Sequence, residues 1–280
     1  MREIKLKARA KINLGLDVVR KREDGYHEVR MIMQMINLYD RITLRRSTEP
    51  GIRVTTNLPY LPVNEDNLVY RAAKLLMEEF KVTEGAEIEL QKYIPVAAGM
   101  AGGSSDAAAA FVGMNRMFRL GLSEQDLMER AVQVGADVPY CIMRGTALAE
   151  GIGEKLTRLP RMPLCYILVG KPGVNVSTKL AYENLGLDTI TSHPDIDGQI
   201  RCIEEGDLYG LTSRMENVFE PGIIRNYPVI QEIKDLMESA GALKAMMSGS
   251  GPTVFGIFDN RQKTEAAAEL LRKSHLARTV

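Results

Sequence analysis

The chain has 280 residues, of which 36 are basic and 36 acidic, so its formal net charge is zero. Hydrophobic residues make up 45% and charged residues 26%, the proportions of an ordinary globular protein. This length predicts one large domain or two closely packed ones. Since the net charge is zero and no Lys/Arg run is interleaved with aromatic residues, we expect no nucleic-acid polymer as a partner.

Membrane and cysteine signals are weak. No segment approaches the roughly eighteen apolar residues of a membrane span, so no membrane partner is expected. The N-terminal residues lack an apolar block followed by a small-residue cleavage site, which predicts a cytoplasmic location. Cys141, Cys165 and Cys202 show no CxxC spacing, so we expect buried small hydrophobic residues rather than a disulfide framework or a zinc site.

Strands dominate the predicted elements at the start of the chain. Apolar residues alternate with others over 3–46, and the polar stretch KREDGYHEV with Asp24-Gly25 predicts a hairpin connection. A further strand pair is predicted over about 41–56. A helix follows near 66–80, and its one apolar face comprises Leu68, Ala72, Leu75, Leu76 and Phe80. Then come a strand over 86–94 and helices near 104–118 and 123–134.

The second half mixes both element types. Strands are predicted over 146–159 and 164–170, and the turn Lys171-Pro172-Gly173 indicates a domain seam. A helix near 228–240 ends at Gly241, and strands over 243–247 and 252–258 precede a last helix from 261. Because helices and strands do not alternate strictly, the predicted fold class is α+β rather than a doubly wound parallel sheet.

A glycine-rich segment, PVAAGMAGGSSDAAAA at 95–110, leads into a predicted helix. Glycine lets backbone N–H groups approach a ligand closely, and a helix N-terminus adds unpaired donors with partial positive charge. Such a loop binds anions. We expect Ser104, Ser105 and Asp106 where the helix cap belongs. The plain alternative is a helix cap with a flexible entry, which needs fewer glycines.

Other catalytic motifs are absent. GxxxxGK[ST] does not occur and no GxGxxG follows a strand, so the segment predicts a phosphate loop of a different kind. GxSxG and HExxH are missing as well. The histidines His27, His193 and His275 offer little basis for a serine triad or a histidine-bound metal.

Two charged residues stand in apolar surroundings. Lys11 interrupts the strand ARAKINLGL, and Asp137 follows a Gly-Ala corner in GADVPY. A buried charge needs a partner, so the two are natural partners for each other. Phosphoryl transfer from a nucleotide requires an anion cradle, a metal, positive charge and a carboxylate for the acceptor's proton. The alternative for each residue is a structural salt bridge or a surface side chain.

A second glycine cluster, MSGSGPT at 247–253, lies between two predicted strands. Its backbone N–H groups and hydroxyls could close over phosphates. A simple hairpin turn explains the same residues equally well.

These segments resemble a known family. ARAKINLGL, PVAAGMAGGSSDAAAA and MSGSGPTVF look like the three motifs of the GHMP kinases. Across nearly the whole chain, the order AKINL, DGYHEV, NEDNLVYRAA, AGMAGGSSDAAA, GADVP, AEGIGE and SGSGPTVF resembles the branch that phosphorylates a cytidyl diphosphate alcohol in the non-mevalonate isoprenoid pathway. The sequence departs from the usual pattern at Ala101, where glycine is usual, and at Met100, where leucine is usual.

The resemblance implies a catalytic pair and an ATP site. Asp137 would deprotonate or orient the substrate's 2-hydroxyl, and Lys11 would stabilise charge. The residues implied for ATP binding are Pro95, Val96, Ala97, Ala98, Gly99, Met100, Ala101, Gly102, Gly103, Ser104 and Ser105 at the phosphates, and Asn64, Asn67 and Lys92 at the adenosine.

The resemblance also implies a substrate site. Tyr26, His27 and Tyr182 would hold the cytosine by stacking and by contacts to its polar edge. Asn13 would reach the substrate near its reacting hydroxyl, and Gly249 and Ser250 of the second glycine cluster would contact it too. Without the resemblance, Tyr182 is a helix aromatic of the kind that is usually core.

The implied protein is a two-domain α+β kinase. Residues 1–160 would form the ATP-binding, ribosomal S5-like N-terminal domain and residues 161–280 a ferredoxin-like C-terminal domain, with ligands in the cleft between them. ATP and Mg²⁺ are the expected cofactors, and no residues are predicted as metal ligands. The expected partner is the small-molecule cytidyl diphosphate substrate, and the expected oligomeric state is a monomer or a weak homodimer.

Three alternatives stay open at this point. A GHMP kinase for another small alcohol would ignore the cytidyl group. A nucleotide-binding regulatory protein would keep the glycine loop without turnover, although the presence of both Lys11 and Asp137 argues against it. A serine hydrolase acting through Ser104 would react with covalent serine reagents.

Overall fold

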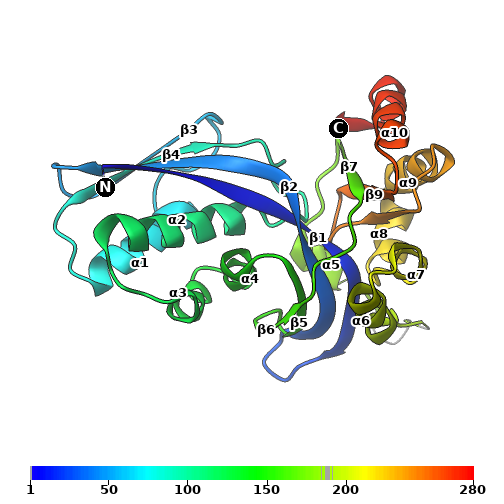
Figure 1. Cartoon of the computed structure of the whole chain (residues 1–280), viewed down its shortest axis with the longest axis horizontal. Helices are drawn as coiled ribbons and strands as arrows, with labels where there is room; N and C mark the ends of the chain where they lie inside the picture. The colour runs from blue at the N-terminus through cyan, green and yellow to red at the C-terminus, as the bar shows by residue number, and fades with distance from the viewer. Residues whose placement is uncertain (1, 184, 187–189, 191) are drawn as a thin grey trace. The chain divides into compact units, whose positions relative to one another are not determined.

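The structure is a computed structural model that describes residues 2–183, 185–186, 190 and 192–280 (Figure 1). Contacts divide the chain into two units. Unit 1 comprises residues 1–11, 35–96 and 101–144, and unit 2 comprises residues 12–34, 97–100 and 145–280. Two long strands, β1 (Glu3–Lys21) and β2 (His27–Ser47), contribute residues to both units. The predicted division at residue 160 therefore stays a prediction, because these contact units interleave along the chain.

Unit 1 is a sheet covered on one face by helices. β3 (Ile52–Thr56) runs parallel to β4 (Gly85–Gln91), and β4 pairs antiparallel with β2 over 41–47. β1 pairs with β2. The helices are α1 (Leu68–Glu79), α2 (Gly102–Phe118), α3 (Glu124–Ala131) and α4 (Val138–Met143), and Figure 1 shows α1 and α2 beneath the sheet.

Helix α2 lies very close to the sheet. Residues 107–110 are four alanines, and all of them are buried. A Cβ added at Gly113 would lie 2.8 Å from a Leu44 methyl and 2.9 Å from a Leu6 methyl. Small side chains on this face let the helix backbone approach the strands closely. This close packing fixes the distance between the N-terminus of α2 and the sheet.

Unit 2 contains the other sheet pairings. β5 (Thr146–Gly151) pairs antiparallel with β2 over 29–34 and with β6 (Lys155–Leu159). A second, antiparallel sheet has the order β10 (Ala277–Thr279), β7 (Tyr166–Pro172), β9 (Val254–Phe258), β8 (Lys244–Met247). The helices are α5 (Thr178–Glu183), α6 (Ile196–Glu205), α7 (Leu208–Ser213), α8 (Glu220–Asn226), α9 (Val229–Ser239) and α10 (Arg261–Ser274).

The α+β prediction is confirmed, and so are most elements. Helices near 66–80, 104–118, 123–134 and 228–240 correspond to α1, α2, α3 and α9. The strand pair predicted over 41–56 was wrong in its pairing, because β4 lies between β2 and β3. The segment 146–159 is two strands, since Gly151 and Gly153 turn the chain at positive φ. The short helix α4 was not predicted.

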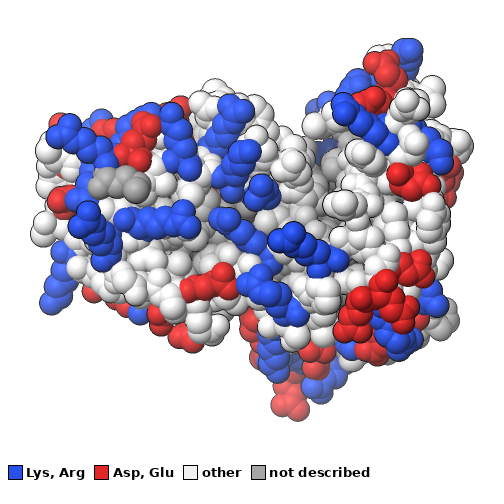
Figure 2. All heavy atoms as spheres, in the orientation of Figure 1, with Lys and Arg blue, Asp and Glu red and all other residues white. Residues whose placement is uncertain are grey.

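Basic and aromatic side chains gather on the outward face of the sheet in unit 1. Figure 2 shows lysine and arginine side chains over β1 and β2. The Lys7 ammonium lies 4.3 Å from the centre of the Tyr39 ring, and the Arg41 guanidinium lies 5.6 Å from that of Tyr93. Within the residues that the structure describes, no helix is long and apolar enough to span a membrane.

Candidate active site

Lys11 is a buried lysine on β1. Residues 10–18 of this strand are buried on both faces, and Lys11 itself is only 5% exposed. Burial lowers the pKa of Lys11, while the negative charge of Asp137 acts in the opposite direction. The structure thus brings the two residues of the predicted catalytic pair together in unit 1.

Asp137 is presented by the start of a helix. It is the N-cap residue of α4 and half-buried, and its side chain makes no capping hydrogen bond. The turn before it is closed by a 3.1 Å hydrogen bond from the Val138 N–H to the Gly135 carbonyl, and a proline in the first turn suits the helix start. Its carboxylate is therefore not used to cap α4, and it is close enough to Lys11 to act on the pKa of that residue.

The glycine-rich segment enters α2 without a side-chain cap. The N-cap residue is Ala101, which adopts a left-handed conformation with φ 52° and ψ 32°, and no side chain caps the helix. The expected cap of Ser104, Ser105 and Asp106 is therefore wrong, because the helix begins at Gly102 and these residues lie within its first turns. Gly103 is exposed, and the N–H groups of the first turn can serve an anion.

Ser105 joins the helix to the strand that carries Lys11. Its buried hydroxyl donates a 2.6 Å hydrogen bond to the Arg9 carbonyl oxygen, two residues before Lys11 on β1. Of the two predicted phosphate-binding serines, Ser105 thus holds backbone in place, whereas Ser104 is half-buried in the first turn.

Residues 97–100 of the first glycine cluster contact the second cluster in unit 2. A Cβ on Gly99 would lie 2.2 Å from the Ser248 carbonyl oxygen, and Gly99 has φ 71°. A Cβ on Gly249 would lie 3.5 Å from the Asn13 side-chain oxygen. The Ser250 hydroxyl is 3.0 Å from that of Thr178. The structure therefore collects Gly99, Asn13 and the second glycine cluster in one place.

Buried polar contacts hold the second glycine cluster. The Asn217 side-chain amide donates 2.8 Å hydrogen bonds to the carbonyls of Met247 and Gly249. Asn217 is only 1% exposed, and β1 passes beside it through a parallel bridge at Leu16. This asparagine was not singled out in the sequence, where a polar residue flanked by Met215, Val218 and Phe219 was the available signal.

Two predicted substrate-binding rings stack on each other. The rings of His27 and Tyr182 lie 4.8 Å apart at 28°, and Tyr182 packs edge-on against Phe219 at 4.8 Å and 82°. Burial lowers the pKa of His27, with Lys21 adding repulsion, which favours a neutral imidazole. Tyr26 lies outside this ring stack, and it is 61% exposed at the hairpin turn.

The predicted adenosine residues have local roles in unit 1. Asn67 caps α1 by accepting from the Val69 N–H at 2.9 Å, and it donates to the Pro62 carbonyl at 2.7 Å. The Asn64 side chain accepts from the Asp66 N–H at 3.2 Å. Lys92 is buried and forms ion pairs with Asp40 and Asp106. The Asn64 and Asn67 side chains thus bond to nearby backbone, whereas the Lys92 ammonium is enclosed by two carboxylates.

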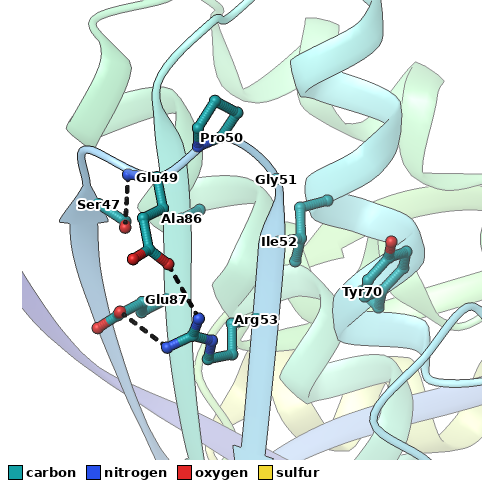
Figure 3. A pocket seen from close by; sticks show the side chains of 9 residues that line it. All are labelled: Ser47, Glu49, Pro50, Gly51, Ile52, Arg53, Tyr70, Ala86 and Glu87. Atoms are coloured by element: carbon teal, nitrogen blue, oxygen red, sulfur yellow. Dashed lines mark hydrogen bonds and ion pairs between the residues drawn. The ribbon is translucent and has the colours of Figure 1, made fainter.

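A separate pocket of about 280 Å³ lies beside the edge strand β3 of the unit 1 sheet (Figure 3). It is lined by residues 47, 49–53, 70, 86 and 87. Figure 3 shows Arg53 between the carboxylates of Glu49 and Glu87, at 3.1 and 3.8 Å. None of the predicted site residues lines it, and its charges already pair with one another.

The comparisons identify the family. The GHMP kinases N-terminal domain matches residues 67–145, and the GHMP kinases C-terminal domain matches residues 190–276. A 4-diphosphocytidyl-2-C-methyl-D-erythritol kinase of Lachnospira eligens is 59% identical over 280 residues, covering 100% of this chain and 97% of that protein. The chain belongs to the GHMP kinases, in the family of the 4-diphosphocytidyl-2-C-methyl-D-erythritol kinases. It is a small-molecule kinase.

Other relatives agree with this family. The 4-diphosphocytidyl-2-C-methyl-D-erythritol kinase of Lachnoclostridium phytofermentans is 57% identical over 94% of this chain and 91% of that protein. A crystal structure of 4-(cytidine 5'-diphospho)-2C-methyl-D-erythritol kinase matches with a TM-score of 0.82 and 32% identity, over 96% of each chain. Homoserine kinase from Cytophaga hutchinsonii, with a TM-score of 0.75 and 22% identity over 98% and 90% of the chains, shares the fold.

Proposed function

We propose that this kinase phosphorylates the 2-hydroxyl of 4-diphosphocytidyl-2-C-methyl-D-erythritol with ATP as donor. The names of its relatives support the substrate. The observation that carries the proposal is the burial of Lys11 beside Asp137, because a buried ammonium next to a carboxylate suits transfer of a phosphoryl group to an alcohol.

Asp137 and Lys11 have different roles at the reacting hydroxyl. The Asp137 carboxylate accepts or orients the proton of the 2-hydroxyl, and the Lys11 ammonium stabilises negative charge as the phosphoryl group moves. Asn13 holds the substrate near that hydroxyl. Most of the rate in such chemistry comes from position and electrostatics, so the burial that fixes Lys11 is part of its action.

The N–H groups at the start of α2 and the glycine clusters bind the ATP phosphates. The first turn of α2 has no side-chain cap, and residues 96–104 would supply further backbone donors. We place Asn64, Asn67 and Lys92 at the adenosine, as the resemblance implies. Gly249 and Ser250 contact the substrate from the second cluster.

Mg²⁺ fits as an ion that arrives with the nucleotide. Among the described residues, no group of three or more His, Cys, Asp or Glu side chains could hold a metal by itself. Mg²⁺ commonly takes one or two protein oxygens together with substrate phosphates. The phosphate oxygens would supply the other ligands, and the ion would neutralise their charge.

His27 and Tyr182 give the kinase its preference for a cytidyl group. Their stacked rings offer an apolar surface with a neutral imidazole for the polar edge of cytosine. Tyr26, exposed at the adjacent turn, would close on the base. We further propose a cytoplasmic monomer or weak homodimer that binds neither a nucleic-acid polymer nor a membrane.

The test is ADP release by the purified protein with ATP, Mg²⁺ and 4-diphosphocytidyl-2-C-methyl-D-erythritol. Parallel assays use Asp137→Ala and a substrate without the cytidyl group. Turnover that requires the cytidyl group and is lost in the variant supports the proposal. Equal turnover of the truncated alcohol would instead favour a kinase for another small alcohol, and ATP binding without turnover would exclude the proposed substrate.

A further inference from the structure

Asp40, Lys92 and Asp106 form a buried charged cluster in unit 1. Their side chains are 0%, 4% and 3% exposed, and they come from β2, from the residue after β4 and from α2. The Lys92 ammonium contacts one oxygen of Asp40 and lies 2.7 Å from one oxygen of Asp106. One cation thus joins two carboxylates that lie 66 residues apart in the sequence (40 and 106).

Asp40 also holds the exit from β4. Its second oxygen accepts hydrogen bonds from the N–H groups of Tyr93 and, at 2.8 Å, Ile94. Asn57 fixes the neighbouring backbone, because it accepts from the Lys92 N–H at 2.8 Å and donates to the Lys92 carbonyl at 3.1 Å. The direction in which the chain leaves the strand for the glycine-rich segment is therefore set by a buried anion.

The same cluster reaches the other end of that segment. A Cβ on Gly102 would lie 3.2 Å from the Lys92 Nζ, so the ammonium lies directly beside the first residue of α2. Asp106 stands one turn further along the same helix. Ile94, just before the glycine-rich segment, therefore bonds to Asp40, and Gly102, where α2 begins within the segment, lies beside Lys92.

The two carboxylates are not equivalent. Burial, reinforced by Asp40 and opposed by Lys92, raises the pKa of Asp106 well above its ordinary value, which favours its protonated form. One oxygen of Asp106 is buried without a hydrogen-bond partner among the described residues. Asp40, by contrast, uses both oxygens, because it accepts from the ammonium and from two backbone N–H groups.

We propose that Asp40 is a positioning residue of this kinase, which fixes the entry to the glycine-rich segment and the start of α2 within it through Lys92, Tyr93 and Ile94. Asp40 touches no ligand in this proposal. It sets the spacing between the exit of β4 and the start of α2, and hence the direction of the N–H groups that receive the ATP phosphates. The proposal rests on the ATP-binding role given above to residues 95–105.

The experiment compares Asp40→Asn with Asp106→Asn and with a surface control, Glu84→Gln, whose carboxylate pairs with Arg46 and is 51% exposed. The dissociation constant of ADP is measured by calorimetry, and KM is measured separately for ATP and for the cytidyl substrate. We expect Asp40→Asn to weaken ADP binding and raise the ATP KM by about tenfold or more, with the KM for the cytidyl substrate changed less than about twofold. Asp106→Asn should weaken ADP binding by no more than about threefold, since the asparagine resembles the protonated acid.

A purely structural role predicts another pattern. Asp40→Asn would then lower the folded fraction and the apparent kcat, while the folded protein bound ADP as the wild type does; that result overturns the proposal. Equal damage from the two variants overturns it as well, because both acids would then act alike. If the wild type binds ADP but does not phosphorylate the cytidyl substrate, the proposed function fails while the ADP comparison still tests Asp40.

A second measurement does not depend on the folding of a variant. Hydrogen exchange of the wild-type amides should show Tyr93 and Ile94 as protected as the residues of β4, because both donate to a buried anion. Exchange of these two amides at the rate of the exposed loop around Asn64 would overturn the proposal.

Discussion

The Ser248 hydroxyl donates a 3.0 Å hydrogen bond to the carbonyl oxygen of Gly99, and Ser248 is fully buried. This bond joins the second glycine cluster to residues 97–100 of the first, within unit 2, and its two residues lie 149 positions apart in the sequence. The position of one cluster therefore depends on the other, and a side chain on Gly99 would push them apart.

We expect Gly99→Ala to lower ATP-dependent activity by about a hundredfold or more, because its Cβ would lie 2.2 Å from the Ser248 carbonyl oxygen and must displace backbone. Gly121→Ala is the matched control. Gly121 has a similar φ of 75° but open space around its Cβ position, so it should lose only about 1–2 kcal/mol of stability and keep its activity. Urea unfolding and ADP release measure both effects, and equal activity of the two variants would contradict the steric argument.

Lys11→Met should lower kcat by roughly three orders of magnitude or more while ADP still binds, because the methionine keeps the volume but removes the charge used in the transition state. The far-ultraviolet circular dichroism should match the wild type, since a buried ammonium is replaced by an apolar group. A kcat within tenfold of the wild type would remove Lys11 from the catalytic pair.

The pH dependence follows from the burial of Lys11. Burial lowers its pKa below the ordinary 10.5, with Asp137 and Cys141 opposing that shift. If catalysis needs the ammonium, kcat/KM falls as pH rises through this lowered pKa, and the fall begins at a lower pH than an exposed lysine would give. Between the two pKa values the unfolded chain binds more protons, so this residue's contribution to the free energy of unfolding increases with pH.

Lys11→Arg checks that assignment, because a guanidinium keeps its charge at alkaline pH. Whatever activity this variant retains should not show the alkaline loss. A loss at the same pH in the variant would assign the titration to another group.

Tyr182→Ala should raise the KM for the cytidyl substrate by about 5- to 150-fold, the range expected for one lost stacking contact of 1–3 kcal/mol, and leave the KM for ATP nearly unchanged. Tyr182→Phe keeps the ring against His27 and Phe219, and should stay much closer to the wild type. Steady-state kinetics with each substrate varied separately measures both. Parallel increases in both KM values would indicate a general loss of structure instead.

Ala101 occupies a left-handed backbone conformation, with φ 52°. Ala101→Gly relieves about 1–2 kcal/mol of strain but adds freedom to the unfolded chain, so the free energy of unfolding should change by less than about 1 kcal/mol. Ala108→Gly, within α2 and 2% exposed, should destabilise by about 1 kcal/mol or more. Urea unfolding of the two variants provides the comparison. Equal losses would mean that position 101 is not strained.

The local spacing of apolar residues predicted much of the fold. The alternation around Leu14 and the helical spacing of Leu68 and Leu76 specify strand and helix directly, and both are found. The apolar run that forms α4 is too short for its period to be recognised. The position of β3 depends on a parallel pairing with β4 across a long connection, which no local pattern encodes.

The candidate site was predictable to a similar degree. Lys11 and Asp137 stood out because a charge in apolar sequence needs a partner, and the structure brings them together. Asp40 and Lys92 carried the same signal, since each lies in phase with the buried apolar residues of its strand, such as Ile42 and Leu90. This alternation would have predicted that both side chains are buried, and that prediction was not made. The hydroxyl bond from Ser105 to the Arg9 carbonyl could not have been foreseen, because it depends on how closely α2 approaches β1.

The passage of β1 and β2 through both contact units has a consequence for engineering. Exchanging one unit with that of a relative would require junctions at 11/12, 34/35, 96/97, 100/101 and 144/145. Two of these junctions lie inside continuous strands and two flank the short stretch 97–100 of the glycine-rich segment. Substrate preference in this chain therefore cannot be transplanted as a single block. A hybrid joined at one point near residue 160 would take residues 12–34, 97–100 and 145–160 of unit 2 from the same parent as unit 1, and the rest of unit 2 from the other parent.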